Sequence, residues 1–600
     1  MRVADFIVQY IHDKLGVSHI FTVTGAGLMH LTDAIALNKD VIGVIPHHEQ
    51  TASMALEAYS RASENFGVGM FTTGPGSTNT ITGLGGAWQD SVPCLFIGGQ
   101  VKRSETSANS KIPNLRQFGV QELNMIPIVE SLCKYAVTLN EPEKIKFELE
   151  KAVYLAKSGR PGPVWLEIPM DVQGAQVIPD DLEGYAPPTN EKPFDDNKFS
   201  TLTNLLKESK RPVIIAGQGI RIAHALDIFE KFVDISGIPV VTTYLGIDTL
   251  KQNDVHYIGK TGVKGDRPAN FAMQNSDLII SIGSSLHVSV IGYDYKQFAR
   301  VAKKVIIDID ETSHKKNTID IDLFIQSDAK DILNELLQFC KDSKLGKYSE
   351  WLKKCNFWKE KYRVCSPEYE KEKNGINSYL FINQLSKQSS ENDVFISDAG
   401  GTFYSMSQGV ELTKPNQRYI TSGAMATMGY TLPAAIGVAF ATNNRVLAIT
   451  GDGSLQQNIQ ELQTLIQYDL PVKLFVLNNY GLNSTRAMQK NYFDSRFFGE
   501  SKSSGISFPD TLKVAEAYGI KAVRVDNYAN LPKIIDDVLS FDGPVICDVI
   551  VPRDQQIIPT VGSKVNDDGS MESRPLEDMF PFLDRDEYRS NLYVDEISRN

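Results

Sequence analysis

The sequence places one acidic residue and one amide residue directly after two consecutive strand-like segments. Asp452 follows the apolar run RVLAIT within the turn GDGS, and Asn479 follows the run PVKLFVLN. A helix-like segment lies between the two runs, and a right-handed β-α-β connection would set the two strands near each other. The carboxylate and the amide oxygen would then meet at one edge of the sheet, where they suit a hard cation such as Mg²⁺.

Glycines flank Asp452, and they would allow backbone N–H groups to approach the phosphate groups of a ligand. Mg²⁺ keeps several water ligands and readily takes phosphate oxygens, so the pattern favours a ligand that carries phosphate. The alternative is an ordinary strand-helix-strand unit in which Asp and Asn only form turns.

The elements that would position these residues fall into three blocks of the chain. Each block alternates short apolar runs with helix-like segments, which indicates parallel β-α-β layering. Examples are HIFTVTG and GVGMFTTG in the first block, PVIIAGQG and SDLIISIG in the second, and VFISDAGG in the third. The predicted fold is therefore α/β, with three doubly wound parallel-sheet domains. We expect a first domain over 1–183, a central Rossmann-like domain over 184–345, a helical connector over 346–375, a third domain over 376–555 and a C-terminal tail or lid over 556–600.

The bulk composition excludes several classes of protein. Hydrophobic residues make up 42% and charged residues 22% of the 600, as in an ordinary globular protein. The net charge of −12 and the absence of a Lys/Arg-rich block argue against nucleic acid as a partner. The six cysteines form no CxxC pair, which fits a reducing compartment. The N-terminus is amphipathic rather than signal-like, and no apolar run approaches the ~20 residues of a membrane span. We therefore expect a cytoplasmic protein without a membrane partner.

The GDG and NN elements at this spacing resemble the diphosphate-binding signature of thiamine-diphosphate (ThDP) enzymes. The resemblance assigns Asp452, Asn479 and the backbone carbonyl of Gly481 to Mg²⁺. In these enzymes a carboxylic acid hydrogen-bonds the pyrimidine N1′ and activates the cofactor. Glu49, in VIGVIPHHEQTASMALEAYSRAS, matches that position. The alternative for Glu49 is an ordinary acidic residue in the first turn of a helix.

Further segments are similar to the acetolactate-synthase-like branch of the family, in its large catalytic subunit. They are FTTGPGSTNTITGLGGAWQDSVPCLFIGGQV (71–101), GRPGPVWLEIPMDVQ (159–173) and ITSGAMATMGYTLPAAIG (420–437). The resemblance covers residues 1–555 and implies a pyrimidine-binding first domain and a diphosphate-binding third domain. It also implies a homodimer or homotetramer, because the family forms its active sites between subunits.

The resemblance carries over to further single residues. Met428 would prop the bent cofactor, although plain core packing is its alternative. Gln121 matches a glutamine near the reacting centre, and a surface amide is its alternative. The remaining cofactor-binding residues implied are Gly74, Gly400, Thr402, Ala426, Gly451, Gly453, Ser454 and Leu482.

Three segments depart from those of acetolactate synthases, and His30 is a fourth departure. Those enzymes carry a Trp in the segment after the Asn pair, where Met488 stands here. Their FDDR-like run, whose Arg touches flavin or substrate, corresponds to SSLHVSVIGYD (284–294), which has no Arg. Their GQHQ turn corresponds to GGTF (400–403), in which Thr402 could still donate a hydrogen bond to a phosphate oxygen.

Several other residues could act on the substrate. His30 stands where the synthases have an apolar residue or proline, so it could face the substrate or simply pack. His47 and His48 precede Glu49, and we take His48 as a candidate proton shuttle because an unperturbed imidazole titrates near ~6.5. Capping of local backbone is their alternative. Arg486 could bind an anionic acceptor or remain solvated.

The resemblance implies a ThDP- and Mg²⁺-dependent carboligase. Such an enzyme decarboxylates a 2-oxo acid, with pyruvate as the first candidate, and transfers the acyl carbanion to a carbonyl acceptor. The tail SMESRPLEDMFPFL and the segment around His30 are similar to those of synthase-like proteins of surface-polysaccharide pathways, which suggests a nucleotide-linked keto sugar as acceptor. The alternatives are acetolactate synthase proper, a 2-oxo acid decarboxylase or C–C lyase, and a non-catalytic binding homologue. FAD could occupy the central domain through AGQGIRIA (216–223) and VIIDID (305–310), but the missing Arg argues against it.

Overall fold

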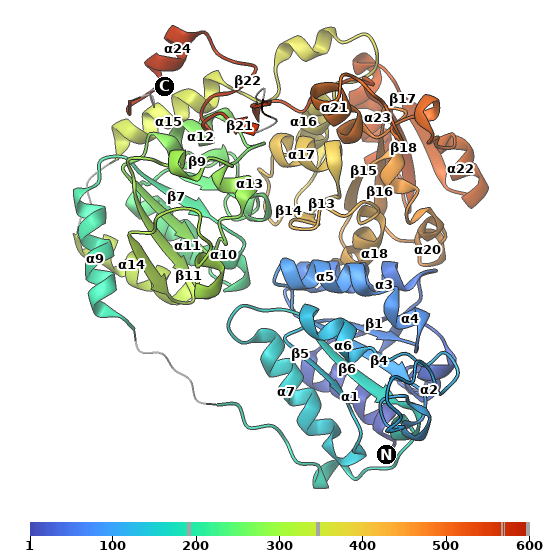
Figure 1. Cartoon of the computed structure of the whole chain (residues 1–600). Helices are drawn as coiled ribbons and strands as arrows, with labels where there is room; N and C mark the ends of the chain where they lie inside the picture. Colours follow the sequence, from blue (N-terminus) through green and yellow to red (C-terminus); the bar gives the residue numbers. More distant parts are fainter. Residues whose placement is uncertain (189–193, 344–347, 566–567, 569–570, 596–600) are drawn as a thin grey trace.

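Three parallel six-stranded sheets, each covered by helices, form the framework of the chain (Figure 1). The computed structural model describes residues 1–600 except 189–193, 344–347, 566–567, 569–570 and 596–600. The prediction of an α/β fold with three parallel-sheet domains is confirmed. Part of the proline-rich stretch 184–198 and part of the expected tail lie outside the described residues.

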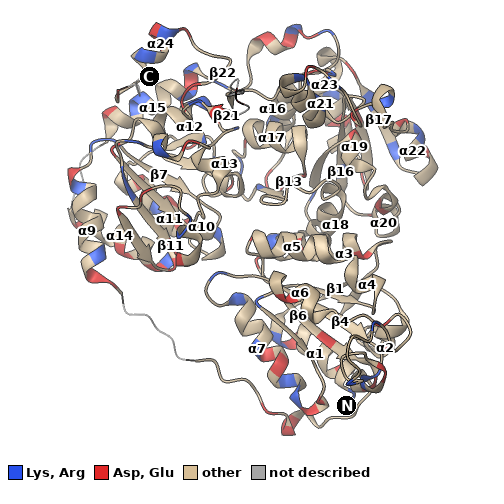
Figure 2. Cartoon of the chain, in the orientation of Figure 1, with Lys and Arg blue, Asp and Glu red and all other residues tan. Residues whose placement is uncertain are grey.

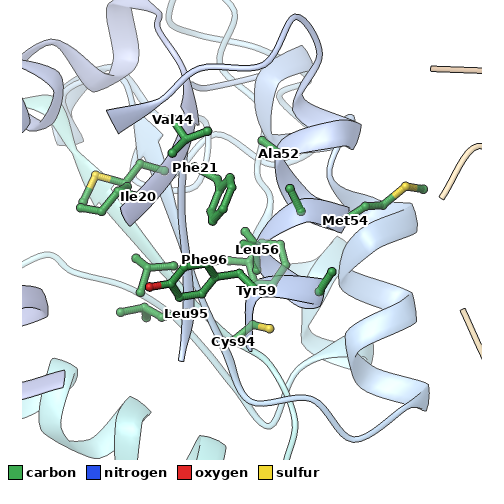
Figure 3. Close-up of a cluster of buried hydrophobic side chains, with 14 of the residues drawn as sticks. Ile20, Phe21, Val44, Ala52, Met54, Leu56, Tyr59, Cys94, Leu95 and Phe96 are labelled. Carbon is green, nitrogen blue, oxygen red and sulfur yellow. The ribbon is translucent and has the colours of Figure 1, made fainter. Parts of the chain in front are cut away.

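The first domain has the strand order β2-β1-β3-β4-β6-β5. Its strands β3, β4 and β6 are buried along their whole length because helices cover both faces of the sheet. Figure 3 shows Leu56 and Tyr59 of helix α3 lying against the sheet residues Phe21 and Phe96. The strands are β1 His19–Val23, β2 Ile42–Val44, β3 Gly67–Phe71, β4 Cys94–Gln100, β5 Tyr135–Thr138 and β6 Val164–Pro169. The helices are α1 Val3–Leu15, α2 Met29–Leu37, α3 Glu49–Ser63, α4 Pro75–Thr78, α5 Ile81–Gln89, α6 Ile126–Val129, α7 Ile145–Lys157 and α8 Met170–Gln173.

The third domain repeats this topology. Its order β14-β13-β15-β16-β18-β17 is again second, first, third, fourth, sixth and fifth along the chain. The strands are β13 Val394–Ser397, β14 Arg418–Thr421, β15 Val446–Gly451, β16 Val472–Asn478, β17 Lys521–Val525 and β18 Val545–Ile550. The helices are α16 Ser378–Gln388, α17 Gly400–Gly409, α18 Thr431–Thr442, α19 Asp452–Leu455, α20 Leu462–Gln467, α21 Asn483–Tyr492, α22 Thr511–Tyr518 and α23 Leu531–Leu539.

The central domain has the order β12-β11-β10-β7-β8-β9, which reverses between β7 and β10 as in dinucleotide-binding sheets. The strands are β7 Pro212–Ala216, β8 Val240–Thr242, β9 Tyr257–Lys260, β10 Leu278–Ile282, β11 Lys303–Asp308 and β12 Leu323–Gln326. The helices are α9 Asp196–Glu208, α10 Gly219–Ile222, α11 Leu226–Ser236, α12 Arg267–Gln274, α13 Val288–Ile291 and α14 Ala329–Ser343.

Two later segments pack onto the central domain. Helix α15 (Ser349–Lys361) buries Trp351 and Trp358 in its core, and the tail adds Leu576 and Met579 to the same core. The buried carboxylate of Glu577 accepts hydrogen bonds from Gln274 and Arg300, which anchors the tail there. The tail elements are β19 Thr560–Val561, β20 Ser563–Val565, β21 Met571–Ser573, β22 Met579–Phe580 and α24 Arg585–Ser590.

Helices α3 and α18 join the first domain to the third, and they lie side by side in Figure 1. A Cβ on Gly437 of α18 would lie only 2.0 Å from the carbonyl oxygen of Ala55, so a glycine is required for this close approach. Figure 2 shows few charged residues on α18, whereas α7, α9 and α22 carry many. The shared apolar core therefore fixes the two domains against each other. Among the described residues, no helix combines the length and apolar character needed to cross a bilayer.

Candidate active site

A cavity of about 290 Å³ opens at the carboxyl ends of the third-domain strands. The turns after β13, β15 and β16 form its walls, together with the loop before α18. Every third-domain residue that the sequence nominated for the cofactor lines this cavity: Gly400, Thr402, Ala426, Met428, Gly451, Asp452, Gly453, Ser454, Asn479, Gly481 and Leu482. The fold thus gathers residues that are up to 82 positions apart, Gly400 to Leu482, around one space.

Strand pairing explains why Asp452 and Asn479 share the cavity. β15 and β16 are parallel neighbours, and Gly451 stands opposite Leu477 in their register. The two residues therefore leave adjacent strands at nearly the same height. The expectation that these strands lie side by side is confirmed.

The surroundings of Asp452 and Asn479 fit a hard cation. Asp452 is buried, and burial raises the pKa of its carboxyl to about 6. Its Oδ2 accepts the backbone N–H of Gly481 at 3.0 Å, and its Oδ1 accepts that of Gly453 at 2.8 Å. The Oδ1 of Asn479 is buried and has no hydrogen-bond partner within the part of the chain that the structure describes. A buried acceptor without a donor is costly, and Mg²⁺ would satisfy it.

Helix N-termini face the same cavity and could hold a diphosphate. Gly400, with φ of +59°, begins α17, and Thr402 lies in the first turn of that helix. Helix α21 begins at Asn483, and both Asn483 and Ser484 line the cavity. Backbone N–H groups at such termini favour anions. The sequence nominated neither of these two residues, although their place four and five residues after Asn479 was a usable signal.

A second cluster lies in the first domain, around Glu49. The Oε2 of this residue accepts a hydrogen bond of 3.0 Å from Nδ2 of Asn79. Gly74, with φ of +66°, allows the carbonyl of Gln121 to approach, because a Cβ on Gly74 would lie 2.5 Å from that oxygen. Neither Glu49 nor Gln121 lines the third-domain cavity of its own chain. The residues nominated in the first domain therefore lie apart from the cavity that the third-domain residues line.

A buried polar network supports the loop that carries Gln121. Thr73 donates to Oε1 of Gln100 at 2.8 Å, and Nε2 of Gln100 donates to the carbonyl of Leu123 at 2.8 Å. The same Nε2 donates to Glu167 at 3.3 Å, and burial raises the pKa of Glu167 to about 7. The sequence did not nominate these residues, because they act through contacts between distant strands.

The nominated histidines take local roles in this structure. The Nδ1 of His48 accepts the N–H of Gln50 at 3.0 Å and so caps α3. The ring of His30 packs against Gly174, where a Cβ would lie 2.9 Å from Nε2. Backbone capping and packing, the alternatives weighed for these two residues, describe their contacts.

Arg486 lies buried rather than in solvent. Its Nε is 2.5 Å from Oε2 of Glu500, a side chain that is also buried. Its Nη2 has no partner and rests against Gly481, where a Cβ would lie 2.1 Å away. The alternative of a solvated Arg486 is therefore wrong, whereas acceptor binding stays a prediction. The side chain packs against the loop that follows Asn479. Met488, two residues further along α21, is 46% exposed.

A larger cavity of about 810 Å³ lies at the strand-order reversal of the central sheet. Gln218, Gly219 and Gly283 line it, together with part of the run 284–294. The first domain contributes Arg160, whose Nη1 lies 3.2 Å from Oδ2 of Asp310. An arginine is thus present at this cavity, although it comes from another domain than the sequence comparison considered.

Three family models match the chain in order. They are the thiamine pyrophosphate enzyme N-terminal TPP binding domain over residues 1–126, the central domain over 199–336 and the C-terminal TPP binding domain over 398–549.

Curated relatives match almost end to end. The acetolactate synthase large subunit of Lactococcus lactis is 33% identical over 565 residues, which cover 92% of this chain and 93% of the relative. That of Cyanidium caldarium is 31% identical over 563 residues, 91% of this chain and 93% of the relative. The chloroplastic acetolactate synthase of Arabidopsis thaliana is 31% identical over 580 residues, 93% of this chain and 83% of the relative.

Proposed function

Because this chain belongs to the thiamine pyrophosphate enzyme family, in its acetolactate-synthase-like branch, we propose that it is a ThDP- and Mg²⁺-dependent carboligase. It would decarboxylate a 2-oxo acid, pyruvate first, and transfer the acyl unit to a carbonyl acceptor. The observation that carries the proposal is that Asp452 and Asn479 line one cavity, and that the buried Oδ1 of Asn479 has no hydrogen-bond partner among the described residues.

The residues present would divide the work between two half-sites, as we call the Glu49 cluster and the third-domain cavity. Asp452, Asn479 and the carbonyl of Gly481 would hold Mg²⁺, and Thr402 with the N-terminus of α17 would hold the diphosphate. Bound ThDP would supply the nucleophilic carbon that takes up the 2-oxo acid and the electron sink for loss of CO₂. The carboxyl of Glu49 would hold a proton at the pyrimidine N1′.

We propose a homodimer or homotetramer, which the separation of Glu49 from the third-domain cavity supports. Glu49 does not line the cavity of its own chain, so a second copy would bring its Glu49 to the cavity that holds Asp452. Mixing Glu49→Gln with Asp452→Ala subunits tests this arrangement. In a mixed dimer, one site combines the intact Asp452 of the first variant with the intact Glu49 of the second, and this site should be active. A mixture that stays inactive would argue for sites within one chain.

Two acceptors are supported by different observations. The names of the relatives favour a second 2-oxo acid, as in acetolactate synthase proper. The exposed Met488, in place of the synthases' Trp, favours a bulkier acceptor such as a nucleotide-linked keto sugar of a polysaccharide pathway. Mass spectrometry of products from pyruvate alone and from pyruvate with a panel of keto sugars distinguishes them. Acetaldehyde as the sole product would instead support a simple decarboxylase.

The central cavity is the place for a nucleotide cofactor, and FAD stays an alternative there. Its glycine-lined reversal point and its volume of about 810 Å³ support such a ligand. An absorption spectrum after denaturation of the purified protein decides the matter. A cytoplasmic location completes the proposal, because all six cysteines are free thiols.

A further inference from the structure

Gly429, which directly follows Met428, is held by side chains on both of its backbone polar groups. Its N–H donates a 2.8 Å hydrogen bond to Oγ of Ser454, in the GDGS turn at the end of β15. Its carbonyl accepts a 2.8 Å hydrogen bond from Nδ2 of Asn458. Both partners are buried, so water does not compete for these bonds.

Asp398 fixes the direction of the Ser454 hydroxyl. This aspartate directly follows β13 and is fully buried, and its Oδ2 accepts the Ser454 hydroxyl at 2.5 Å. A hydroxyl has a single proton, and here that proton points to Asp398. Ser454 is therefore left with lone pairs for the Gly429 N–H and has no hydroxyl proton for a phosphate. Its contribution to a phosphate group would be limited to its backbone N–H.

Asn458 is fixed in a similar way from the first domain. Its Oδ1 accepts a hydrogen bond of 3.2 Å from the hydroxyl of Thr51, two residues after Glu49. That contact leaves its Nδ2 for the carbonyl of Gly429 and so determines the orientation of the amide.

These two hydrogen bonds and the close packing around Gly429 restrict movement of its backbone. Its φ is +78°, and a Cβ there would lie 2.8 Å from Cβ of Gln457 and 3.0 Å from Nδ2 of Asn458. Ala426, three residues earlier, also has a positive φ, +46°. A loop with two left-handed residues keeps its shape only when its surroundings determine it.

We propose that Asp398, through Ser454, and Asn458 are positioning residues that hold the 426–429 loop and thereby set the place of Met428 in the cavity. This inference rests on the proposed function, since Met428 would prop the bent cofactor there. The three residues would affect the activation of bound ThDP more than its affinity, because none of them supplies a side-chain ligand to Mg²⁺ or a hydroxyl proton to phosphate.

The test measures exchange of the C2 proton of bound ThDP with solvent deuterium, by NMR after acid quench, at saturating ThDP and Mg²⁺. Asp398→Asn, Ser454→Ala and Asn458→Asp should each slow the exchange ~10-fold or more, because small misplacements of reacting groups carry large kinetic costs. ThDP affinity, from fluorescence titration, should change less than about 3-fold. Ser454→Thr keeps a hydroxyl and should restore most of the exchange rate.

Ser389→Ala is the matched control. Ser389 is a buried serine of the same domain whose hydroxyl donates to the carbonyl of Ser386 and accepts from Gln417, away from the cavity. It should lower the melting midpoint without slowing the exchange. Unchanged exchange in both Asp398→Asn and Ser454→Ala would overturn the inference, and so would equal slowing in Ser389→Ala. Failure of the wild-type chain to bind ThDP would instead overturn the proposed function.

Discussion

The backbone N–H of Gly481 donates a 3.0 Å hydrogen bond to Oδ2 of Asp452, and this bond closes the turn after β16 onto the turn after β15. Asp452 and Asn479 line the same cavity, and the Oδ1 of Asn479 has no hydrogen-bond partner among the described residues. The two strand ends therefore form one oxygen-rich site, to which the metal and the diphosphate of the proposal both belong.

Replacing Asp452 by Ala should remove this site. Mg²⁺-dependent binding of ThDP should weaken ~100-fold or more, because a carboxylate ligand and the anchor of the Gly481 turn are lost together. Titration of intrinsic fluorescence with ThDP at fixed Mg²⁺ measures the change. Asp526→Ala, at an exposed position of the same domain, serves as the control. An affinity equal to that of the wild type would refute the metal site.

Replacing Glu49 by Gln should separate catalysis from binding. Turnover should fall ~10²- to 10⁴-fold because the amide cannot hold a transferable proton at N1′. The amide oxygen can still accept from Asn79, so the helix start and ThDP affinity should be retained. Steady-state rates and ThDP titrations of the same preparation are the measurements. Wild-type turnover in this variant is incompatible with the proposed role of Glu49.

Replacing Arg486 by Met should loosen the loop after Asn479. The change removes the closer of the two arginines that pair with the buried carboxylate of Glu500 and leaves Arg553 at 3.4 Å, so we expect a loss of roughly 1–3 kcal/mol in unfolding free energy. Urea unfolding of the single variant and of Arg486→Met/Glu500→Gln measures it. The double variant should recover part of the stability. A single variant as stable as the wild type would show that the ion pair contributes nothing.

Glu167 should make the stability of the first domain depend on pH. Burial raises its folded-state pKa to about 7, above the ordinary value of 4.5, so the folded protein binds its proton more tightly than the unfolded chain does. The resulting stabilisation is present below about pH 4.5 and is lost as the pH rises through about 7. Glu167→Gln should therefore gain stability over the wild type by roughly 2–3 kcal/mol more near pH 8 than near pH 5. Urea unfolding of both proteins at the two pH values measures this difference in stability. The same difference between variant and wild type at both pH values would mean that Glu167 does not titrate in this range.

The sequence predicted the features that follow from local pattern. Apolar runs that end in Gly, Asp or Asn located the strand ends, and the helix between Asp452 and Asn479 made the two strands neighbours. The burial of Arg486 could not be foreseen, because its partner Glu500 lies 14 residues later in a loop without periodicity. The shared strand order of the first and third domains was also hidden, since topology survives without any repeat in the residues.

The two half-sites show a second limit of sequence reasoning. Pattern alone placed Glu49 at a helix start and Asp452 at a strand end, but it carries no information on which copy of the chain completes which site. The family resemblance implied sites between subunits, and the separation of Glu49 from the cavity of its own chain is consistent with that expectation.

The fate of pyruvate labelled with carbon-13 at C2 tests the central claim most directly. The protein would be incubated with ThDP, Mg²⁺, labelled pyruvate and the acceptor panel, and the products followed by NMR. We expect CO₂ to be released only with both cofactors present, and the labelled carbon to become bonded to a new carbon atom. Labelled acetaldehyde as the only product, or labelled pyruvate recovered intact with every acceptor, would contradict this expectation.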